Sequence, residues 1–169
     1  MNVWVVNSEE PIPEITGKGR LLRGGLIADS FSKDKKNNVI WWCSTFLHYE
    51  KEFYAQKSVN IDLKRNLHLK MLHTGKAYEK NVSIARIRYC KLLAKVFKKT
   101  IQTETKPDVI YCAWPHIELS YECVKYGKKY NIKKRRKNLP PGRQYNERRI
   151  CENDCSVIGS LRQKCECRF

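Results

Sequence analysis

The residues best suited to chemistry lie near the amino terminus, in a loop that combines glycine with positive charge. Gly17, Lys18, Gly19, Arg20 and Arg23 follow a short apolar run and lead into a leucine-rich segment. Glycine lets backbone N–H groups turn outward, and the basic side chains supply charge-assisted donors. A strand–loop–helix unit of this kind directs the positive end of the helix dipole at a bound anion. The loop therefore predicts a phosphate or carboxylate site, while the same residues also fit a plain turn with a solvated basic rim.

The segments that position this loop alternate between strands and helices. Apolar runs of strand length predict buried strands at 3–6, 39–43, 67–72 and 109–113. We expect the third of these to pair with 58–63. The aromatic and charged stretch 45–57 has no clean period and is interpreted as a long loop.

Three helices are predicted between and after these strands. The first carries an apolar stripe, Ser83 is a good N-cap for the second, which runs to about residue 103, and the third covers 117–130. The side chains expected to face inward are Leu21, Leu22, Leu26, Ile27 and Phe31 in the first helix, Ile84, Ile87, Leu92, Leu93, Val96 and Phe97 in the second, and Leu119, Cys123 and Val124 in the third.

Strands separated by helices imply parallel crossovers, and hence an α/β fold with a Rossmann-like, doubly wound parallel sheet. Ligands of such sheets bind beyond the carboxyl ends of the strands. The loops that follow Val6, Cys43, Leu72 and Ala113 should therefore form one functional rim.

Composition narrows the class of partner. The chain has 169 residues and a formal net charge of +17, which allows one domain and favours anionic partners: nucleotide sugars, lipid headgroups or nucleic acid. No run of about 20 apolar residues is present, and the amino terminus lacks the order of a signal peptide. These features predict a cytoplasmic protein, compatible with a peripheral position at the inner face of the cell membrane. Its cysteines are then expected to be thiols.

The chain changes character near Ile132. Arginine replaces lysine as the main basic residue, and segment 133–169 sustains neither a helical nor a strand period. We expect this tail to be disordered, either as the product of a shifted reading frame or as an authentic basic tail. Its basic part, 133–149, supports an alternative function as a small nucleic-acid-binding protein. The tail cysteines lack the two-residue spacers of a zinc knuckle, so no metal site is predicted; they are Cys151, Cys155, Cys165 and Cys167.

Three motifs together resemble the N-terminal half of family-4-type glycosyltransferases. They are the glycine-basic loop 7–23, the block 41–53 that reads WWCSTFLHYEKEF, and the KPDVI segment 106–110 followed by Ile117-Glu118-Leu119. More narrowly, they resemble the fucosaminyltransferase-like enzymes of bacterial surface-polysaccharide synthesis. The resemblance covers about residues 1–132 and implies the GT-B architecture of two Rossmann-like domains facing a cleft. In it the N-terminal domain receives a lipid-linked acceptor and the C-terminal domain holds the nucleotide sugar, which is a co-substrate; no cofactor is implied.

The resemblance also assigns roles to individual residues. It implies that Gly17 and Gly19 allow close approach of the donor diphosphate, while Lys18, Arg20 and Arg23 supply charge.

Two histidines are candidates on the acceptor side. His48 matches the histidine of the Ser-Thr-Phe block and would bond an acceptor hydroxyl. His116 lies at the mouth of the fourth strand, where related enzymes sometimes place a cleft histidine, and is the one weak candidate for catalysis. Either ring would equally fit a local hydrogen bond. Glu118 is expected to be a first-turn helix residue rather than an acid or base.

The resemblance ends after Ile132, where a fifth apolar strand and a second domain are expected and the basic run begins instead. We therefore expect 1–132 to be an acceptor-side domain, 133–169 to be a foreign tail, and the chain by itself to be a truncated transferase without activity.

Overall fold

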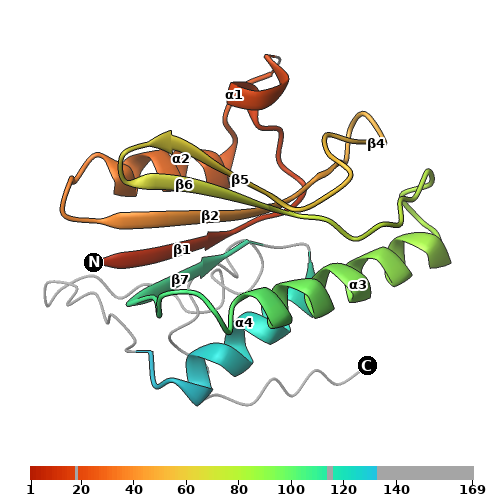
Figure 1. Ribbon diagram of the computed structural model, residues 1–169. Coiled ribbons are helices and arrows are strands. Elements are labelled where there is room, and N and C mark those ends of the chain that lie inside the picture. Colours follow the sequence, from red (N-terminus) through yellow and green to blue (C-terminus); the bar gives the residue numbers. More distant parts are fainter. Residues whose placement is uncertain (18, 114–115, 133–169) are drawn as a thin grey trace, which may run out of the picture.

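The predicted strands form one mixed sheet in the computed structural model, which describes residues 1–17, 19–113 and 116–132 (Figure 1). The tail 133–169, and with it the predictions of disorder, of a shifted frame and of a nucleic-acid-binding segment, lies outside the described residues. The elements are β1 (Asn2–Val6), α1 (Pro13–Thr16), α2 (Arg23–Ser32), β2 (Asn38–Ser44), β3 (Phe46–Leu47), β4 (Glu52–Phe53), β5 (Val59–Lys64), β6 (Leu67–Leu72), α3 (Ile84–Thr100), β7 (Val109–Cys112) and α4 (Ile117–Lys129).

The main sheet has five strands in the order β5-β6-β2-β1-β7. β1 runs parallel to both β2 and β7, and β2 runs parallel to β6. β5 pairs with β6 in the antiparallel sense, as the sequence predicted for 58–63. The α/β class and a mostly parallel sheet are thus confirmed, and the arrangement is compatible with a Rossmann-like fold. The strand order reverses at β1: β2 lies on one side of β1, and β7, which comes later in the chain, lies on the other.

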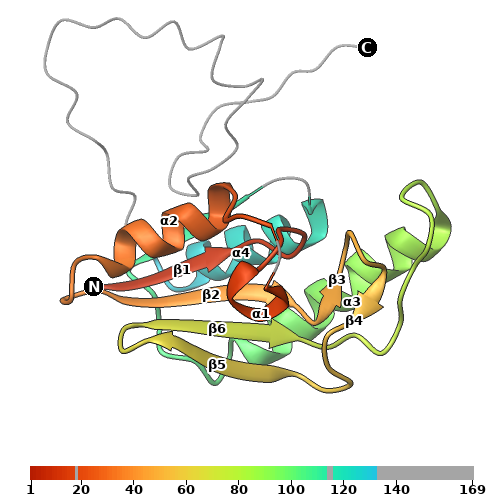
Figure 2. The ribbon, with the colours of Figure 1, turned by 90° about the horizontal axis from the view of Figure 1, so that it is seen from above.

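Helices cover both faces of this sheet (Figure 1). Trp4 and Trp42 belong to the cluster under α3 and α4, whereas Val3, Val5 and Trp41 belong to the cluster under α2. Alternate residues of one strand therefore enter opposite cores, which is why β1 reads as a continuous apolar run. In the view from above, α2 lies on one face of the sheet and α3 lies on the opposite face (Figure 2).

The prediction of a long loop at 45–57 missed two short strands within it. β3 and β4 form a small antiparallel hairpin in which Phe46 opposes Phe53, with ring centroids 5.3 Å apart. Phe46 is buried and its ring also lies 4.9 Å from that of Tyr78. Burial of these aromatic rings, rather than a sequence period, orders the segment.

Part of the predicted helix packing was also wrong. Leu26, Ile84 and Ile87 were expected to face inward, yet they are 56%, 69% and 53% exposed. The fully buried residues of α2 are small, while the predicted Ile27 and Phe31 are partly buried and pack against the core. A Cβ added at Gly25 would meet Leu21 Cδ2 at 2.6 Å and Trp41 Cη2 at 3.0 Å. α2 therefore lies too close to the sheet for a leucine to fit beneath it.

α3 behaves differently. It buries Tyr89, Leu93 and Phe97, spaced four residues apart, and its first turn extends beyond this contact. Its Ser83 N-cap is confirmed, because the hydroxyl accepts from the Arg86 N–H at 3.1 Å. None of the helices in the described ranges combines the length and apolarity needed to cross a bilayer.

Two substitutions on α3 test this assignment of faces. Phe97→Ala should lower the free energy of unfolding by about 3–5 kcal/mol, because it empties a fully buried site between Trp4 and Trp42. Ile87→Ala on the exposed face should change it by less than about 0.5 kcal/mol. Chemical denaturation of both variants measures the difference. Equal losses would mean that Ile87 is buried after all.

Candidate functional site

The four loops expected to share one rim do meet, and each brings one polar side chain to the same place. Glu9 follows β1, His48 follows β2 and β3, Tyr78 follows β6, and His116 follows β7. The first two turns of α3 add Arg86 and Cys90. We call these six residues the rim cluster. It lies at the carboxyl ends of the parallel strands, beside the point where the strand order reverses.

Glu9 is the centre of the rim cluster. Its Oε1 lies 2.8 Å from Arg86 Nη2, 3.1 Å from His116 Nε2 and 3.7 Å from His48 Nδ1. The same oxygen accepts a hydrogen bond from Tyr78 Oη at 3.3 Å. Burial alone would raise the pKa of Glu9, but the contact with His116 and the charges of His116, His48 and Arg86 outweigh it and lower the pKa to about 2. Glu9 is therefore a carboxylate at neutral pH.

His116 is the most deeply buried of the six, at 3% exposed. Its Nδ1 lies 3.4 Å from Cys90 Sγ. Its Nε2 is within ion-pair distance of Glu9 but lacks a well-aligned hydrogen-bond acceptor among the described residues. Burial would lower the pKa of His116; the contacts with Cys90 and Glu9, together with the charge of Glu9, outweigh burial and raise it to about 9. His116 is thus an imidazolium at neutral pH.

His48 has the opposite character. Its Nδ1 lies 2.5 Å from Tyr78 Oη and 3.5 Å from Lys51 Nζ. Burial lowers the pKa of His48 and the nearby cations Lys51, Arg86 and His116 add to the effect, so that the attraction of Glu9 does not restore it. The ring is neutral at pH 7 and can accept a proton.

The rim cluster therefore holds a carboxylate, a cationic imidazole and a neutral imidazole within one small space. Groups whose environments push their pKa values apart are the usual basis of acid–base chemistry. Sequence reasoning found the two histidines but missed Glu9, Tyr78, Arg86 and Cys90. Within the described ranges, no set of three or more His, Cys, Asp or Glu side chains is arranged to hold a metal ion.

The glycine-basic loop lies apart from these contacts. Gly17 and Gly19 adopt φ of 66° and 81°, the left-handed region that favours glycine. Arg20 and Arg23 are exposed, and Arg23 is the first residue of α2. Lys18 lies outside the described residues.

The α2 N-terminus, which the sequence predicted to face a phosphate or a carboxylate, is occupied by a carboxylate of the chain itself. Glu10 Oε2 accepts from Gly24 N at 2.7 Å and from Gly25 N at 3.1 Å. Glu10 can bind these N–H groups because only residues 11–22, which include α1, separate it from α2. Glu118 lies in the first turn of α4, as expected.

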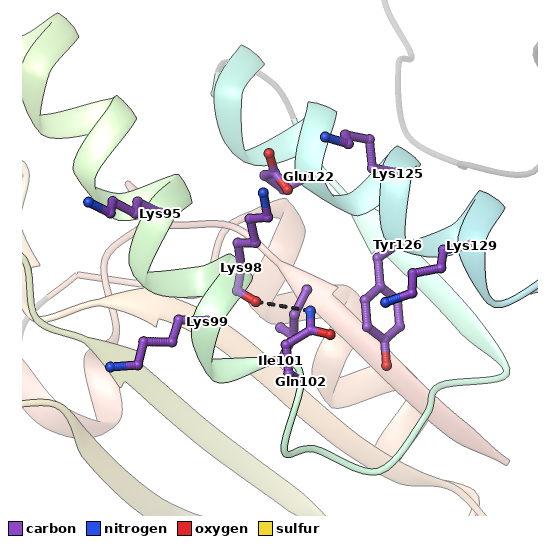
Figure 3. A pocket seen from close by; sticks show the side chains of 9 residues that line it. All are labelled: Lys95, Lys98, Lys99, Ile101, Gln102, Glu122, Lys125, Tyr126 and Lys129. Atoms are coloured by element: carbon purple, nitrogen blue, oxygen red, sulfur yellow. Dashed lines mark hydrogen bonds between the residues drawn. The ribbon is translucent and has the colours of Figure 1, made fainter.

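A second polar feature is a groove of about 520 Å³ between α3 and α4 (Figure 3). Ile101 and Tyr126 contribute apolar surface, and five lysines line it: Lys95, Lys98, Lys99, Lys125 and Lys129. Because α3 runs antiparallel to the strands, this lysine groove lies toward their amino ends, away from the rim cluster.

Comparisons of the chain with protein-family models, with curated proteins and with solved structures find no match. The assignment of function therefore rests on the geometry described above.

The carboxylate at the α2 N-terminus can be tested by its removal. Glu10→Ala should lower the free energy of unfolding by about 1–3 kcal/mol, because two buried N–H donors lose a charged acceptor. Glu10→Gln keeps one acceptor oxygen and should lose less. Glu50→Ala, at an exposed position, is the control and should have almost no effect. Denaturant titration of the three variants orders them; a Glu10→Ala loss no larger than that of Glu50→Ala would contradict the assignment.

The rim cluster should also shape stability against pH. The pKa of Glu9 falls on folding from 4.5 to about 2, so its stabilisation is present above about pH 4.5 and is lost as the pH falls toward 2. The pKa of His116 rises from 6.5 to about 9, so its stabilisation is complete below about pH 6.5 and is lost as the pH rises toward 9.

Calorimetric melting from pH 2 to pH 9.5 measures the loss of stability at both ends of this range. Relative to the wild type, Glu9→Gln should lose less stability between pH 4.5 and 2, and His116→Asn should lose less between pH 6.5 and 9. His68→Asn, which removes a surface histidine paired with Asp62, is the matched control. If His116→Asn and the wild type lose stability in parallel between pH 6.5 and 9, the imidazolium assignment is wrong.

Proposed function

We propose that the described residues are the acceptor-side, Rossmann-like domain of a GT-B glycosyltransferase of the family-4 type, akin to the fucosaminyltransferase-like enzymes of bacterial surface-polysaccharide synthesis. Such an enzyme moves a sugar from a nucleotide-sugar donor to a lipid-linked glycan. The observation that carries the proposal is the rim cluster: a neutral histidine, a carboxylate and two cations at the carboxyl ends of β1, β2 and β7. These lie where a parallel sheet binds its ligands.

Glycosyl transfer makes two demands that these residues suit. An acceptor hydroxyl must be oriented and give up a proton, and the negative charge of the departing diphosphate must be stabilised. His48 is neutral and can accept a hydroxyl proton or hydrogen bond. All contacts of Glu9 with the other members of the cluster fall on Oε1, which leaves Oε2 to orient the sugar. Arg86 and His116 supply positive charge.

The lipid part of the acceptor would lie along the first turn of α3. Ile84 and Ile87 are exposed there, and the neighbouring Val82 is 96% exposed. These apolar side chains flank Arg86 at the rim. Apolar surface next to a polar cluster fits a ligand with a sugar headgroup and a prenyl chain, and it supports a peripheral position at the membrane.

The donor diphosphate would lie against Gly17, Lys18, Gly19, Arg20 and Arg23. Glu10 already occupies the α2 N–H groups, so binding would depend on the N–H groups of the left-handed loop and on the two arginines. Because these contacts are few, we expect diphosphates to bind weakly, with Kd no tighter than about 1 mM, or about −4 kcal/mol.

NMR titration of the full chain with UDP tests this proposal. The amide signals of Gly17 and Gly19 should shift, and Arg20→Ala should weaken binding about tenfold or more, the value of one charge-assisted bond. Arg65→Ala, at an exposed position away from this loop, is the control. Binding of UDP that is indifferent to Arg20→Ala would refute the site.

The lysine groove favours a second candidate, a small nucleic-acid-binding protein. Its five lysines could follow a phosphate backbone, as could the basic segment 133–149 that lies outside the described residues. Binding of a fluorescent single-stranded oligonucleotide discriminates between the candidates. The nucleic-acid function requires affinity that falls steeply with salt and is reduced by Lys98→Ala with Lys125→Ala; the transferase function requires neither.

A further inference from the structure

Cys90 is a member of the rim cluster to which the proposed transfer reaction gives no role. It lies on α3 and is partly buried, with Sγ 3.4 Å from His116 Nδ1. The other nitrogen of the same ring lies 3.1 Å from Glu9 Oε1. Sulfur, imidazole and carboxylate therefore form a continuous line, the order in which a cysteine nucleophile, its proton partner and an orienting acid are arranged in thiol enzymes.

The charges around the sulfur favour its reactive form. With Glu9 on Nε2, the imidazolium of His116 directs its Nδ1–H at Cys90, and a cationic N–H beside sulfur stabilises the thiolate. Arg86 lies one helical turn before Cys90 on the same face of α3. Across the rim, His48 is neutral, Tyr78 is protonated because its pKa is raised mainly by burial and also by Glu9, and the ammonium of Lys51 bonds Asn81. Arg86 and His116 thus provide two positive charges against one carboxylate, which leaves a net positive charge beside the sulfur.

Position separates Cys90 from the other cysteines of the described residues. Cys43, Cys112 and Cys123 are buried, so a reagent in solvent has little access to their sulfur atoms. Burial raises the pKa of the Cys43 and Cys123 thiols, whereas bonds to Cys123 and Ser120 lower the pKa of Cys112 inside the core. Cys90 instead lies in the rim cluster beside a cation.

We propose that Cys90 is a reactive thiol, activated by its contact with His116 and Glu9, and that it is the site at which hydroperoxides oxidise this protein. The sulfur attacks one peroxide oxygen, so that an S–O bond forms and the O–O bond breaks. Sulfur is oxidised by two electrons and the peroxide is reduced. His116 gives its Nδ1 proton to the departing hydroxide or alkoxide, which leaves as water or alcohol, and Cys90 becomes a sulfenic acid.

Oxidation would alter the rim cluster directly. The step leaves His116 without its Nδ1 proton. The uncharged sulfenic acid favours the return of that proton less than the sulfur it replaces, so Glu9 alone supports the charged form of the ring. The modification thereby connects the redox state of Cys90 to the charge of the acid–base site, and this holds whatever reaction the rim cluster performs.

Alkylation of the fully reduced 169-residue chain tests the activation. Cleavage after Glu79 and Glu104 yields a peptide whose single cysteine is Cys90, so mass spectrometry follows its carbamidomethylation apart from that of the other cysteines. With iodoacetamide at pH 6.5, Cys90 should react at least about fivefold faster in the folded chain than in guanidinium, because the charged N–H of His116 lies beside the attacking sulfur only in the folded chain. Cys43, Cys112 and Cys123 should react more slowly in the folded chain. This comparison needs no variant.

Two substitutions then identify the cause. His116→Asn keeps a hydrogen-bond donor without the charge, and Glu9→Gln removes the orienting carboxylate; both should reduce the folded-chain rate of Cys90 at pH 6.5 by about fivefold or more. His68→Asn is the control and should leave the rate unchanged. Hydrogen peroxide followed by dimedone should label Cys90 and spare Cys43, Cys112 and Cys123. A Cys90 rate lower in the folded than in the unfolded chain, a rate unaffected by His116→Asn, or the absence of a dimedone adduct on Cys90 would each overturn the proposal.

Discussion

The end of β1 depends on one constraint: a carboxylate that is largely removed from water must be paired. The Glu9 side chain is 14% exposed, and its Oε1 lies near Arg86, His116, His48 and Tyr78. These partners come from α3, from the start of α4, from the β3–β4 hairpin and from the loop after β6. The largely buried carboxylate of Glu9 therefore joins four segments. Without one of the cations the carboxylate would lack part of its charge compensation, and without the carboxylate the cations would face one another.

The sheet places this charge where it can act. The strand order reverses at β1, because β2 lies on one side of it and β7 on the other. The loop after β1 leads to α2 on one face of the sheet, and the loop after β7 leads to α4 on the opposite face. α2 covers one face closely through Gly24, Gly25 and Ala28. The opposite face is filled by large rings, in which Trp4 meets Trp42 at 5.5 Å and Tyr126 at 5.0 Å. This packed aromatic layer supports the rim cluster at the carboxyl ends of the strands.

Local sequence was sufficient for the strands because each apolar run has the length and period of a buried strand, and β2 and β6 lie where the pattern placed them. It was not sufficient for the inner faces of the helices. Ile84 and Ile87 have helical spacing, but periodicity cannot show how far a helix extends beyond the sheet it covers. His48 and His116 were recognised as polar residues in loops that follow strands. Glu9, Tyr78 and Arg86 were not, since a charge pair between residues 77 positions apart is set by tertiary contacts alone.

His48 and His116 both face Glu9, yet one ring is neutral and the other is charged. This difference follows from their other neighbours. His116 is closer to the carboxylate, at 3.1 Å against 3.7 Å for His48, and its second nitrogen meets the sulfur of Cys90. Burial opposes the charged form of both rings, but at His116 it is outweighed. At His48 the second neighbour is the ammonium of Lys51, which disfavours a further positive charge and adds to burial. One carboxylate thus supports a cationic histidine on the side where sulfur accepts a hydrogen bond, and a neutral histidine on the side where the ammonium of Lys51 opposes a second positive charge. Lys51, which contacts neither Glu9 nor His116 in these hydrogen bonds, is therefore a residue that helps to keep His48 available as a base.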